Sequence, residues 1–421
     1  MGRHSSARGL GGCFEQYIAA AAFALLASIQ GCGGGGDGGG SSSAAAAPAA
    51  IPVAAAGQNV QPIVVDPGPA GTVNLAFTSV TLCAPGSANC ATIDHVLVDT
   101  GSTGLRIISS LLPASLALPP QTDAGGNPVA ECAQFANGFT WGPVKLADLK
   151  IAGEQASRLP IQVIDPNFST VPSLCARTGV PNNTVQALSA NGILGLGLFL
   201  QDCGNACAQS TQPGFYYACP ASGCRQTTLA EAAQVQHPVS MFAVNNNGVI
   251  IQLSSVPEAG AARASGALVF GINTQANNRL GTATVVAVDP GTGYFTTWYN
   301  GTAYPHSIMD SGSNAFFFQD SGIAVCSSSS LTPGFYCPAV TKSASATIQG
   351  LDGASATVSF SVANAASLVT NNPDFTAFNN LGGPTATVFD WGLPFFFGRN
   401  VFTAIEGQTT PGGPTGPYLA F

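Results

Sequence analysis

Two segments far apart in the chain carry the same residues capable of chemistry. Residues 95–103 read His-Val-Leu-Val-Asp-Thr-Gly-Ser-Thr, and residues 306–314 read His-Ser-Ile-Met-Asp-Ser-Gly-Ser-Asn. Each apolar run ends in an Asp-x-Gly-Ser turn, so we expect Asp99 and Asp310 to terminate two buried strands. Two carboxyls held close together share one proton, and the pair titrates in two separated steps. Such a pair can activate water and protonate a carbonyl, which predicts hydrolysis without a metal or cofactor.

A second pair of matching segments follows the first. Residues 193–195 read Ile-Leu-Gly after Asp99, and residues 396–398 read Phe-Phe-Gly at a similar distance after Asp310. We expect each of these segments to pack as a strand beside the preceding Asp turn, with its glycine leaving room for that turn. Each half of the chain thus has the same order of elements, which predicts two similar lobes that face each other and contribute one Asp each.

The composition agrees with an all-β protein of two lobes. The chain has 421 residues, of which 46% are hydrophobic and only 8% are charged, and it is rich in Gly and Pro. Short β-branched runs with frequent Gly and Pro favour strands over helices. The formal net charge of −8 argues against nucleic acid as a partner, because such binding needs a basic face.

The first 32 residues have the character of an export signal. Arg3 and Arg8 precede an apolar stretch over residues 17–29, which is too short to span a bilayer. The segment Ile29-Gln30-Gly31-Cys32 resembles the lipobox of bacterial lipoproteins. That resemblance implies that Cys32 is acylated and anchors the protein in a lipid bilayer, at the periplasmic or cell-surface face of the outer membrane. The alternative is ordinary signal cleavage nearby.

The expected domain map follows from these features. Residues 1–32 form the signal, and residues 33–56 form a flexible Gly/Ser/Ala tether. Residues 57–265 form the N-terminal lobe with Asp99, and residues 266–421 form the C-terminal lobe with Asp310. We expect the protein to be a monomer.

The cysteines predict disulfides. Once Cys13 and Cys32 are set aside, an even number remains, which in an exported protein implies pairing. Short loops favour the bridges Cys83–Cys90 and Cys326–Cys337. The pairing of four others stays open: Cys203, Cys207, Cys219 and Cys224. Those four could bind zinc together with His237, but their spacing is poor for a zinc site and the compartment is oxidising, so we expect no metal.

The two Asp motifs and their downstream segments resemble the pepsin-type aspartic peptidases, a bilobal β fold. Residues 191–197 resemble the segment that closes the first motif, residues 266–271 resemble the strand between the lobes, and the resemblance covers residues 63–421. It implies that Asp99 and Asp310 hold the water that attacks a peptide or protein substrate. It also implies supporting roles for six residues of the turns: Thr100, Gly101, Ser102, Ser311, Gly312 and Ser313. A narrower resemblance is to bacterial pepsin-like lipoproteins, and it implies a location and a fold but no substrate.

The region above the first motif departs from that family. Arg106 stands where the family typically has Trp, and Phe135 stands where the mobile flap typically has Tyr, so their hydrogen bond cannot form. We expect the flap at residues 134–141, with four residues at the flap or cleft: Phe135, Gly138, Phe139 and Trp141. Arg106 either makes a cation–π contact with one of these aromatic residues or is a surface residue of a differently shaped cleft.

Two function classes remain open. The first is an aspartic endopeptidase that uses the Asp pair. The second is a non-catalytic lipoprotein that binds peptide or glycan in the cleft between the lobes, which Arg106, the altered flap and the absence of a basic prosegment favour. A Ser-His-Asp site is not favoured, because no Gly-x-Ser-x-Gly elbow precedes a helix. We expect loops at Asp320, Asp374 and Asp390, core packing for residues 395–397, and strand-end roles for His95 and His306.

Overall fold

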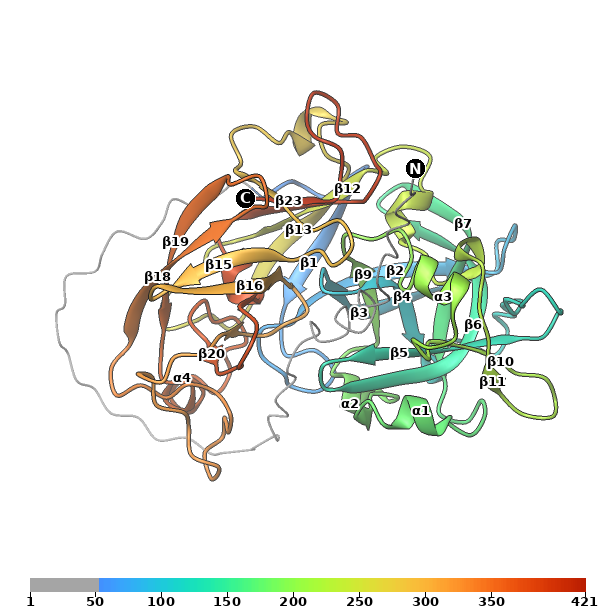
Figure 1. Ribbon diagram of the computed structural model, residues 1–421, viewed down its shortest axis with the longest axis horizontal. Coiled ribbons are helices and arrows are strands. Elements are labelled where there is room, and N and C mark those ends of the chain that lie inside the picture. Colours follow the sequence, from blue (N-terminus) through green and yellow to red (C-terminus); the bar gives the residue numbers. More distant parts are fainter. Residues whose placement is uncertain (1–52) are drawn as a thin grey trace, which may run out of the picture.

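The computed structural model describes residues 53–421, and these form two β lobes that lie side by side (Figure 1). The expected all-β, bilobal architecture is confirmed. The expected signal and lipidated Cys32 lie outside the described residues, as does most of the expected tether. Among the described residues, no helix is long and apolar enough to cross a membrane.

The N-terminal lobe is a strongly curved sheet with short helices at its edges. Its strands are β2 (Ala76–Cys83), β3 (Cys90–Asp99), β4 (Thr103–Ile108), β5 (Val129–Phe135), β6 (Gly138–Ile151), β7 (Glu154–Ile164), β8 (Val180–Pro181), β9 (Gly192–Leu196), β10 (Tyr216–Ala218) and β11 (Arg225–Gln226). Its short helices are α1 (Ser173–Ala176), α2 (Val185–Leu188) and α3 (Asn205–Gln209). The apolar side chains of β2, β3, β4, β6, β7 and β9 fill its core.

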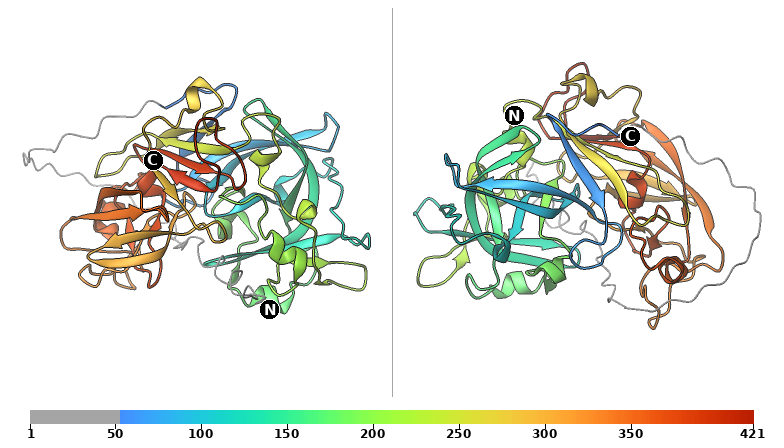
Figure 2. Two further views of the ribbon diagram at one scale, coloured as in Figure 1. Left: turned by 45° about the horizontal axis from the view of Figure 1, so that its top comes forward. Right: turned by 180° about the vertical axis from the view of Figure 1, so that it is seen from behind.

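Six strands continue this sheet from the N-terminal lobe toward the C-terminal lobe. They are β1 (Val60–Val65), β13 (Ala264–Phe270), β12 (Gly248–Leu253), β22 (Asn400–Ala404), β23 (Tyr418–Ala420) and β14 (Val285–Ala287). Strand β1 pairs antiparallel with β13 from Val60↔Val269 to Val65↔Ala264, and the two run side by side in the rear view of Figure 2. The expected lobe boundary at residues 265/266 falls inside β13. The part of the sheet that joins the lobes contains β1 from the start of the described chain and β22 and β23 from its end.

The C-terminal lobe has a sheet of its own. Its strands are β15 (Phe295–Tyr299), β16 (Thr302–Met309), β17 (Phe316–Phe317), β18 (Lys342–Gln349), β19 (Ser355–Val362), β20 (Gly382–Gly383) and β21 (Asp390–Trp391). Its helices are α4 (Ala365–Asn371) and α5 (Leu393–Phe396). A dense aromatic cluster fills this lobe, with Phe389 stacked on Phe318 at 4.9 Å and tilted against Trp391 at 4.6 Å between ring centroids.

Each Asp turn has a parallel partner strand, but the expected partner in the second lobe is wrong. In the first lobe β9 runs parallel to β3, with Asp99 opposite Gly195, as expected. In the second lobe the strand parallel to β16 is β21, with Met309 opposite Trp391. Gly392 therefore takes the place of Gly195, and a Cβ at Gly392 would collide with the carbonyl oxygen of Ala315.

The expected partner segment, residues 396–398, packs elsewhere. Phe396 ends helix α5, and Phe397 forms an isolated bridge with Leu253 of β12. Both side chains are buried in the main core, which confirms core packing for residues 395–397. Residues 396–398 match the apolar-apolar-Gly pattern because residues 395–397 are core phenylalanines, and not because they form the strand beside the Asp turn.

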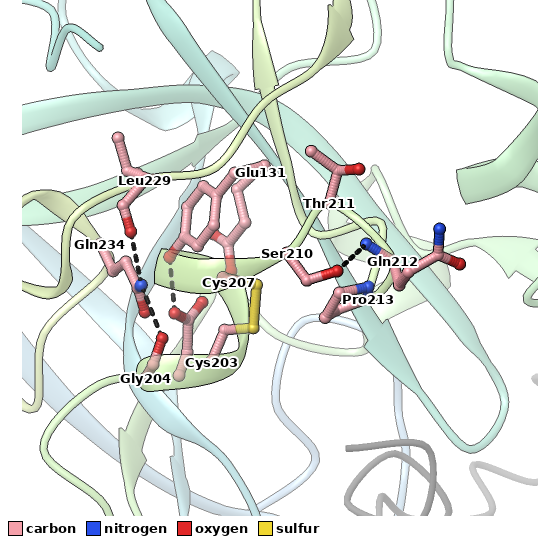
Figure 3. Close-up of a disulfide and its surroundings, with 12 residues drawn as sticks. Glu131, Cys203, Gly204, Cys207, Ser210, Thr211, Gln212, Pro213, Leu229 and Gln234 are labelled. Atoms are coloured by element: carbon pink, nitrogen blue, oxygen red, sulfur yellow. Dashed lines mark hydrogen bonds between the residues drawn. A yellow bond between two sulfur atoms is a disulfide. The ribbon is translucent and has the colours of Figure 1, made fainter. Parts of the chain in front are cut away.

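All ten cysteines of the described chain form disulfides. The expected Cys83–Cys90 and Cys326–Cys337 bridges are confirmed. The open pairing among four cysteines is Cys203–Cys207, which ties the residue before the N-cap of α3 to the helix (Figure 3), and Cys219–Cys224. The fifth bridge, Cys132–Cys175, ties β5 to α1.

The Cys132–Cys175 bridge is expected to contribute most to stability. It closes the longest loop, with a sequence separation of 43 against 4 for Cys203–Cys207. The loop-entropy relation gives about 4 kcal/mol for the long loop and about 2 kcal/mol for the short one. Replacing both cysteines of each pair by Ala and measuring denaturant unfolding tests this. Equal losses for the two pairs would contradict the loop-length explanation.

Candidate active site

The two Asp turns are fastened to each other by reciprocal hydrogen bonds across the lobe boundary. The amide of Thr100 donates to Ser311 Oγ at 3.1 Å, and the amide of Ser311 donates to Thr100 Oγ1 at 2.9 Å. Each hydroxyl also donates to the strand below the opposite turn, Thr100 Oγ1 to the Met309 carbonyl at 3.0 Å and Ser311 Oγ to the Val98 carbonyl at 2.7 Å. Neither turn can move without breaking bonds to the other.

This arrangement brings the carboxyls of Asp99 and Asp310 next to each other, each beside the glycine of the opposite turn. The amide of Gly101 donates to Asp99 Oδ1 and the amide of Gly312 donates to Asp310 Oδ1, both at 2.8 Å. A Cβ at Gly101 would lie 2.5 Å from Asp310 Cγ, and one at Gly312 would lie 2.6 Å from Asp99 Oδ1. Both positions therefore require glycine, because any side chain would push the carboxyls apart.

A serine orients the second oxygen of each carboxyl. Ser102 Oγ donates to Asp99 Oδ2, and Ser313 Oγ lies 2.9 Å from Asp310 Oδ2. Both carboxyls are buried, with Asp99 6% and Asp310 1% exposed. Burial raises the pKa of Asp310 well above its usual range, and the nearby carboxyls of Asp99 and Asp390 raise it further. Asp310 therefore retains a proton at a pH at which an exposed aspartate would be ionised.

A third carboxyl, which the sequence interpretation placed in a loop, belongs to this site. Asp390 lies in β21, is 5% exposed, and has its Oδ2 atom 2.5 Å from Ser313 Oγ. The prediction of a loop was wrong because a polar residue in a short segment gives no strand signal. The available signal was the sequence Phe389-Asp390-Trp391-Gly392, in which two aromatic residues flank the Asp and a glycine follows. Asp320 and Asp374 do lie outside strands, as expected.

The two histidines of the repeated motif lie within strands rather than at strand ends. His95 sits in β3 at an irregularity in its pairing with β2, has a positive φ of 45°, and lies 3.4 Å from Asp66. His306 lies in β16, where its ring packs against Tyr294 at 5.2 Å. Neither pairs with the Asp turns.

A cleft of about 1030 Å³ opens beside the turn that follows Asp99. Both lobes contribute to its lining, which includes Thr100, Gly101, Ser102, Phe135, Tyr294 and Met309. The cleft is large enough to hold several residues of an extended peptide.

The expected flap is the hairpin of β5 and β6, and only its tip faces the cleft. Phe135 pairs with Gly138 across the turn and lines the cleft. A Cβ at Gly138 would collide with the carbonyl oxygen of Val180. Phe139 and Trp141, expected at the flap or cleft, instead lie in a separate buried cluster with the Cys132–Cys175 bridge and Tyr217.

Arg106 makes one of the expected aromatic contacts and a set of ionic contacts that the sequence did not indicate. Its guanidinium carbon lies 5.9 Å from the centroid of the Phe135 ring, and its Nη2 atom lies 2.6 Å from Glu131 Oε1 and 3.0 Å from Asp202 Oδ2. The side chain is 2% exposed, so the alternative of a surface residue was wrong. Since Glu131 lies on β5, Arg106 ties the base of the hairpin to β4.

The cluster around Arg106 contains more acid than base. Burial raises the pKa of Asp202 well above its usual range, and the neighbouring Glu131 raises it further. The phenol of Tyr216 donates to Asp202 Oδ1 at 2.5 Å, which satisfies the other oxygen of that carboxyl. The Cys203–Cys207 bridge and Gln234, which donates to the carbonyls of Gly204 and Leu229, hold the loop next to Asp202 (Figure 3).

Residues 55–421 match the model of a family described as a protein of unknown function, DUF3443. The chain belongs to this family. The sequence matches no curated protein. Among solved structures, the fold of this DUF3443 protein is similar to the crystal structure of an aspartic proteinase from Irpex lacteus. The TM-score is 0.50 at 13% identity, over 86% of this chain and 96% of the other, which shows a pepsin-like fold.

Arg106→Met is expected to destabilise this DUF3443 protein by about 3–5 kcal/mol, because it leaves two buried carboxyls without their cation. Arg263→Met is the matched control. Its side chain is 70% exposed and its nearest carboxylate lies 3.8 Å away, so it should lose at most about 1 kcal/mol. The triple variant Arg106→Met/Glu131→Gln/Asp202→Asn should recover part of the loss. Equal denaturation curves for the two single variants would show that the buried ion cluster does not hold the hairpin base.

Proposed function

We propose that this DUF3443 protein is an aspartic endopeptidase that hydrolyses exposed, extended peptides in the cleft between its lobes. The supporting observation is the close placement of the Asp99 and Asp310 carboxyls, held by the reciprocal Thr100–Ser311 contacts beside a cleft lined by both lobes. The pepsin-like fold supports the same proposal, although a fold alone does not define an activity.

In this proposal the two carboxyls have different roles. Asp310 carries the shared proton, because burial and two neighbouring carboxyls raise its pKa. Asp99 then accepts a proton from a water molecule whose oxygen attacks the peptide carbonyl carbon, while Asp310 donates its proton to the carbonyl oxygen. The tetrahedral diol collapses as one of its hydroxyls returns a proton to Asp310 and the C–N bond breaks, while the leaving amine takes the proton from Asp99.

Asp99→Asn and Asp310→Asn are each expected to lower kcat by on the order of a thousandfold, since each removes one partner of the acid–base pair. The measurement is cleavage of casein and a peptide library by the detergent-solubilised full chain between about pH 3 and 7. Asp374 is an exposed loop residue of the C-terminal lobe, so Asp374→Asn is the matched control and should cleave normally. Cleavage that persists in both dyad variants would rule out the Asp pair as the catalyst.

A second candidate is a non-catalytic protein that binds peptide or glycan in the same cleft. The Arg106–Glu131–Asp202 cluster favours it, since it fixes the base of a hairpin that a peptidase needs to move. Peptide binding by the wild-type chain without cleavage at any tested pH would support this second function over the first.

We also propose that acylated Cys32 anchors the protein to the outer membrane, at its periplasmic or cell-surface face, with the folded body carried on the tether as a monomer. Cys32→Ser should abolish acylation and release the protein from the membrane fraction, because the thiol is the acylation site. Cys13→Ser, a cysteine within the expected signal, is the matched control and should leave both unchanged. Mass measurement of the mature N-terminus and membrane fractionation provide the readouts, and a Cys32→Ser protein that stays membrane-bound would contradict the anchor.

A further inference from the structure

The hydroxyl of Ser313 lies between two carboxyls. Its Oγ atom is 2.9 Å from Asp310 Oδ2 and 2.5 Å from Asp390 Oδ2. All three side chains are buried, with Ser313 0%, Asp310 1% and Asp390 5% exposed. Ser313 is therefore the link between the Asp pair and a third acid.

The link through Ser313 requires a proton in addition to that of the Ser313 hydroxyl. A serine hydroxyl has one hydrogen to donate, and an ionised carboxylate can only accept. Both short contacts are hydrogen bonds only if one of the two carboxyls is neutral and donates to Ser313 Oγ. The protons on Ser313 and on one carboxyl then complete a chain from Asp390 to Asp310.

The first lobe has no counterpart of this third acid. In β9 the residue opposite Leu97 is Ile193, whereas in β21 the residue opposite Ile308 is Asp390. Ser102 accordingly has Asp99 as its carboxyl partner, and the position equivalent to Asp390 is apolar. Asp390 is thus a departure from the symmetry of the two lobes and is not needed to form the strand.

The surroundings of Asp390 keep it neutral. The strand partners of Asp390 are Ile308 of β16 and Phe317 of β17, both apolar. The charged groups that face it are Asp99 and Asp310, both acidic, and no cation of the described chain forms an ion pair with it. Its Oδ1 atom has no hydrogen-bond partner. Burial raises the pKa of Asp390 well above its usual range; the hydrogen bond from Ser313 lowers this pKa, and the charge of Asp99 raises it.

We propose that Asp390 is a positioning residue that stores a proton for the Asp pair and passes it through Ser313. In the stored state, which applies once Asp310 has given up its own proton, the Asp390 hydroxyl donates to Ser313 Oγ, and the Ser313 hydroxyl donates to ionised Asp310. Transfer moves each of the two protons along one hydrogen bond, so that Asp310 becomes neutral and the Asp390 carboxylate accepts from Ser313. The proposal relies on the proposed function only where it concerns cleavage.

The consequence is that the Asp pair stays singly protonated to a higher pH than two carboxyls alone would allow. When the site has lost one proton, the remaining proton can occupy the Asp pair while Asp390 carries the charge. The negative charge on Asp390 then opposes removal of the last proton from Asp310. Asp390 therefore extends the alkaline limit of the site.

Asp390→Asn tests this in the full chain, because its amide can still donate to Ser313 Oγ but cannot titrate. We expect the alkaline limb of the kcat profile to move to lower pH by about one unit, a tenfold lower kcat at a fixed pH on that limb. The acid limb should stay in place. Asp320→Asn is the matched control, since Asp320 bonds Tyr299 and Lys342 away from the Asp pair, and its profile should equal that of the wild type. An unchanged alkaline limb in Asp390→Asn would overturn the role in cleavage.

Infrared spectroscopy separates this inference from the proposed function, because it needs no activity. At neutral pH the wild-type chain should show a protonated-carboxyl C=O band from Asp390 that is absent from Asp390→Asn and retained in Asp320→Asn. Identical bands in wild type and Asp390→Asn would mean that Asp390 is ionised and would overturn the proton store. A wild-type chain that shows the Asp390 band but cleaves nothing would leave the proton store in place and defeat the peptidase proposal.

Discussion

The reciprocal hydrogen bonds between Thr100 and Ser311 are the contacts on which the site depends. They join two turns that belong to different lobes, and they fix the turns so closely that Gly101 and Gly312 have no room for a side chain. The sheet formed by β1, β13, β12 and β22 provides the matching constraint from below, because it crosses from one lobe toward the other. Any relative rotation of the lobes would first break this contact and separate Asp99 from Asp310.

Two buried clusters in this chain contain more carboxyls than bases. Asp99, Asp310 and Asp390 form one, and Glu131 and Asp202 around Arg106 form the other. The folded-state pKa values of Asp310, Asp390 and Asp202 are raised, so their contribution to stability is present below the unfolded value of about 3.9 and is lost as the pH rises through the folded values. Both clusters therefore make the fold more stable at acidic than at alkaline pH.

The repeated Asp-x-Gly-Ser turns were sufficient to predict the fold and to bring Asp99 and Asp310 together, because each turn is a local structure coded by neighbouring residues. The partner strand in the second lobe could not be predicted from its pattern. Residues 396–398 are more apolar than residues 390–392, yet β21 lies beside the turn because a neutral, hydrogen-bonded Asp390 can be buried like an apolar residue. The partners of Arg106 were missed for another reason, since Glu131 and Asp202 are distant in sequence and only the fold brings them together.

The free-energy cost of burying three carboxyls favours a catalytic role of the site over simple binding. Placing a carboxyl in a buried position costs several kcal/mol unless it is neutralised, and apolar replacements of buried charges are often more stable. The first lobe shows that the fold accepts an apolar residue at the position of Asp390, because Ile193 occupies the equivalent place. A cleft that only bound a peptide could use backbone and apolar contacts and would gain stability from such a replacement. Three neighbouring carboxyls, two of them linked through Ser313, are instead suited to holding and moving protons, which is the property that hydrolysis by an Asp pair requires.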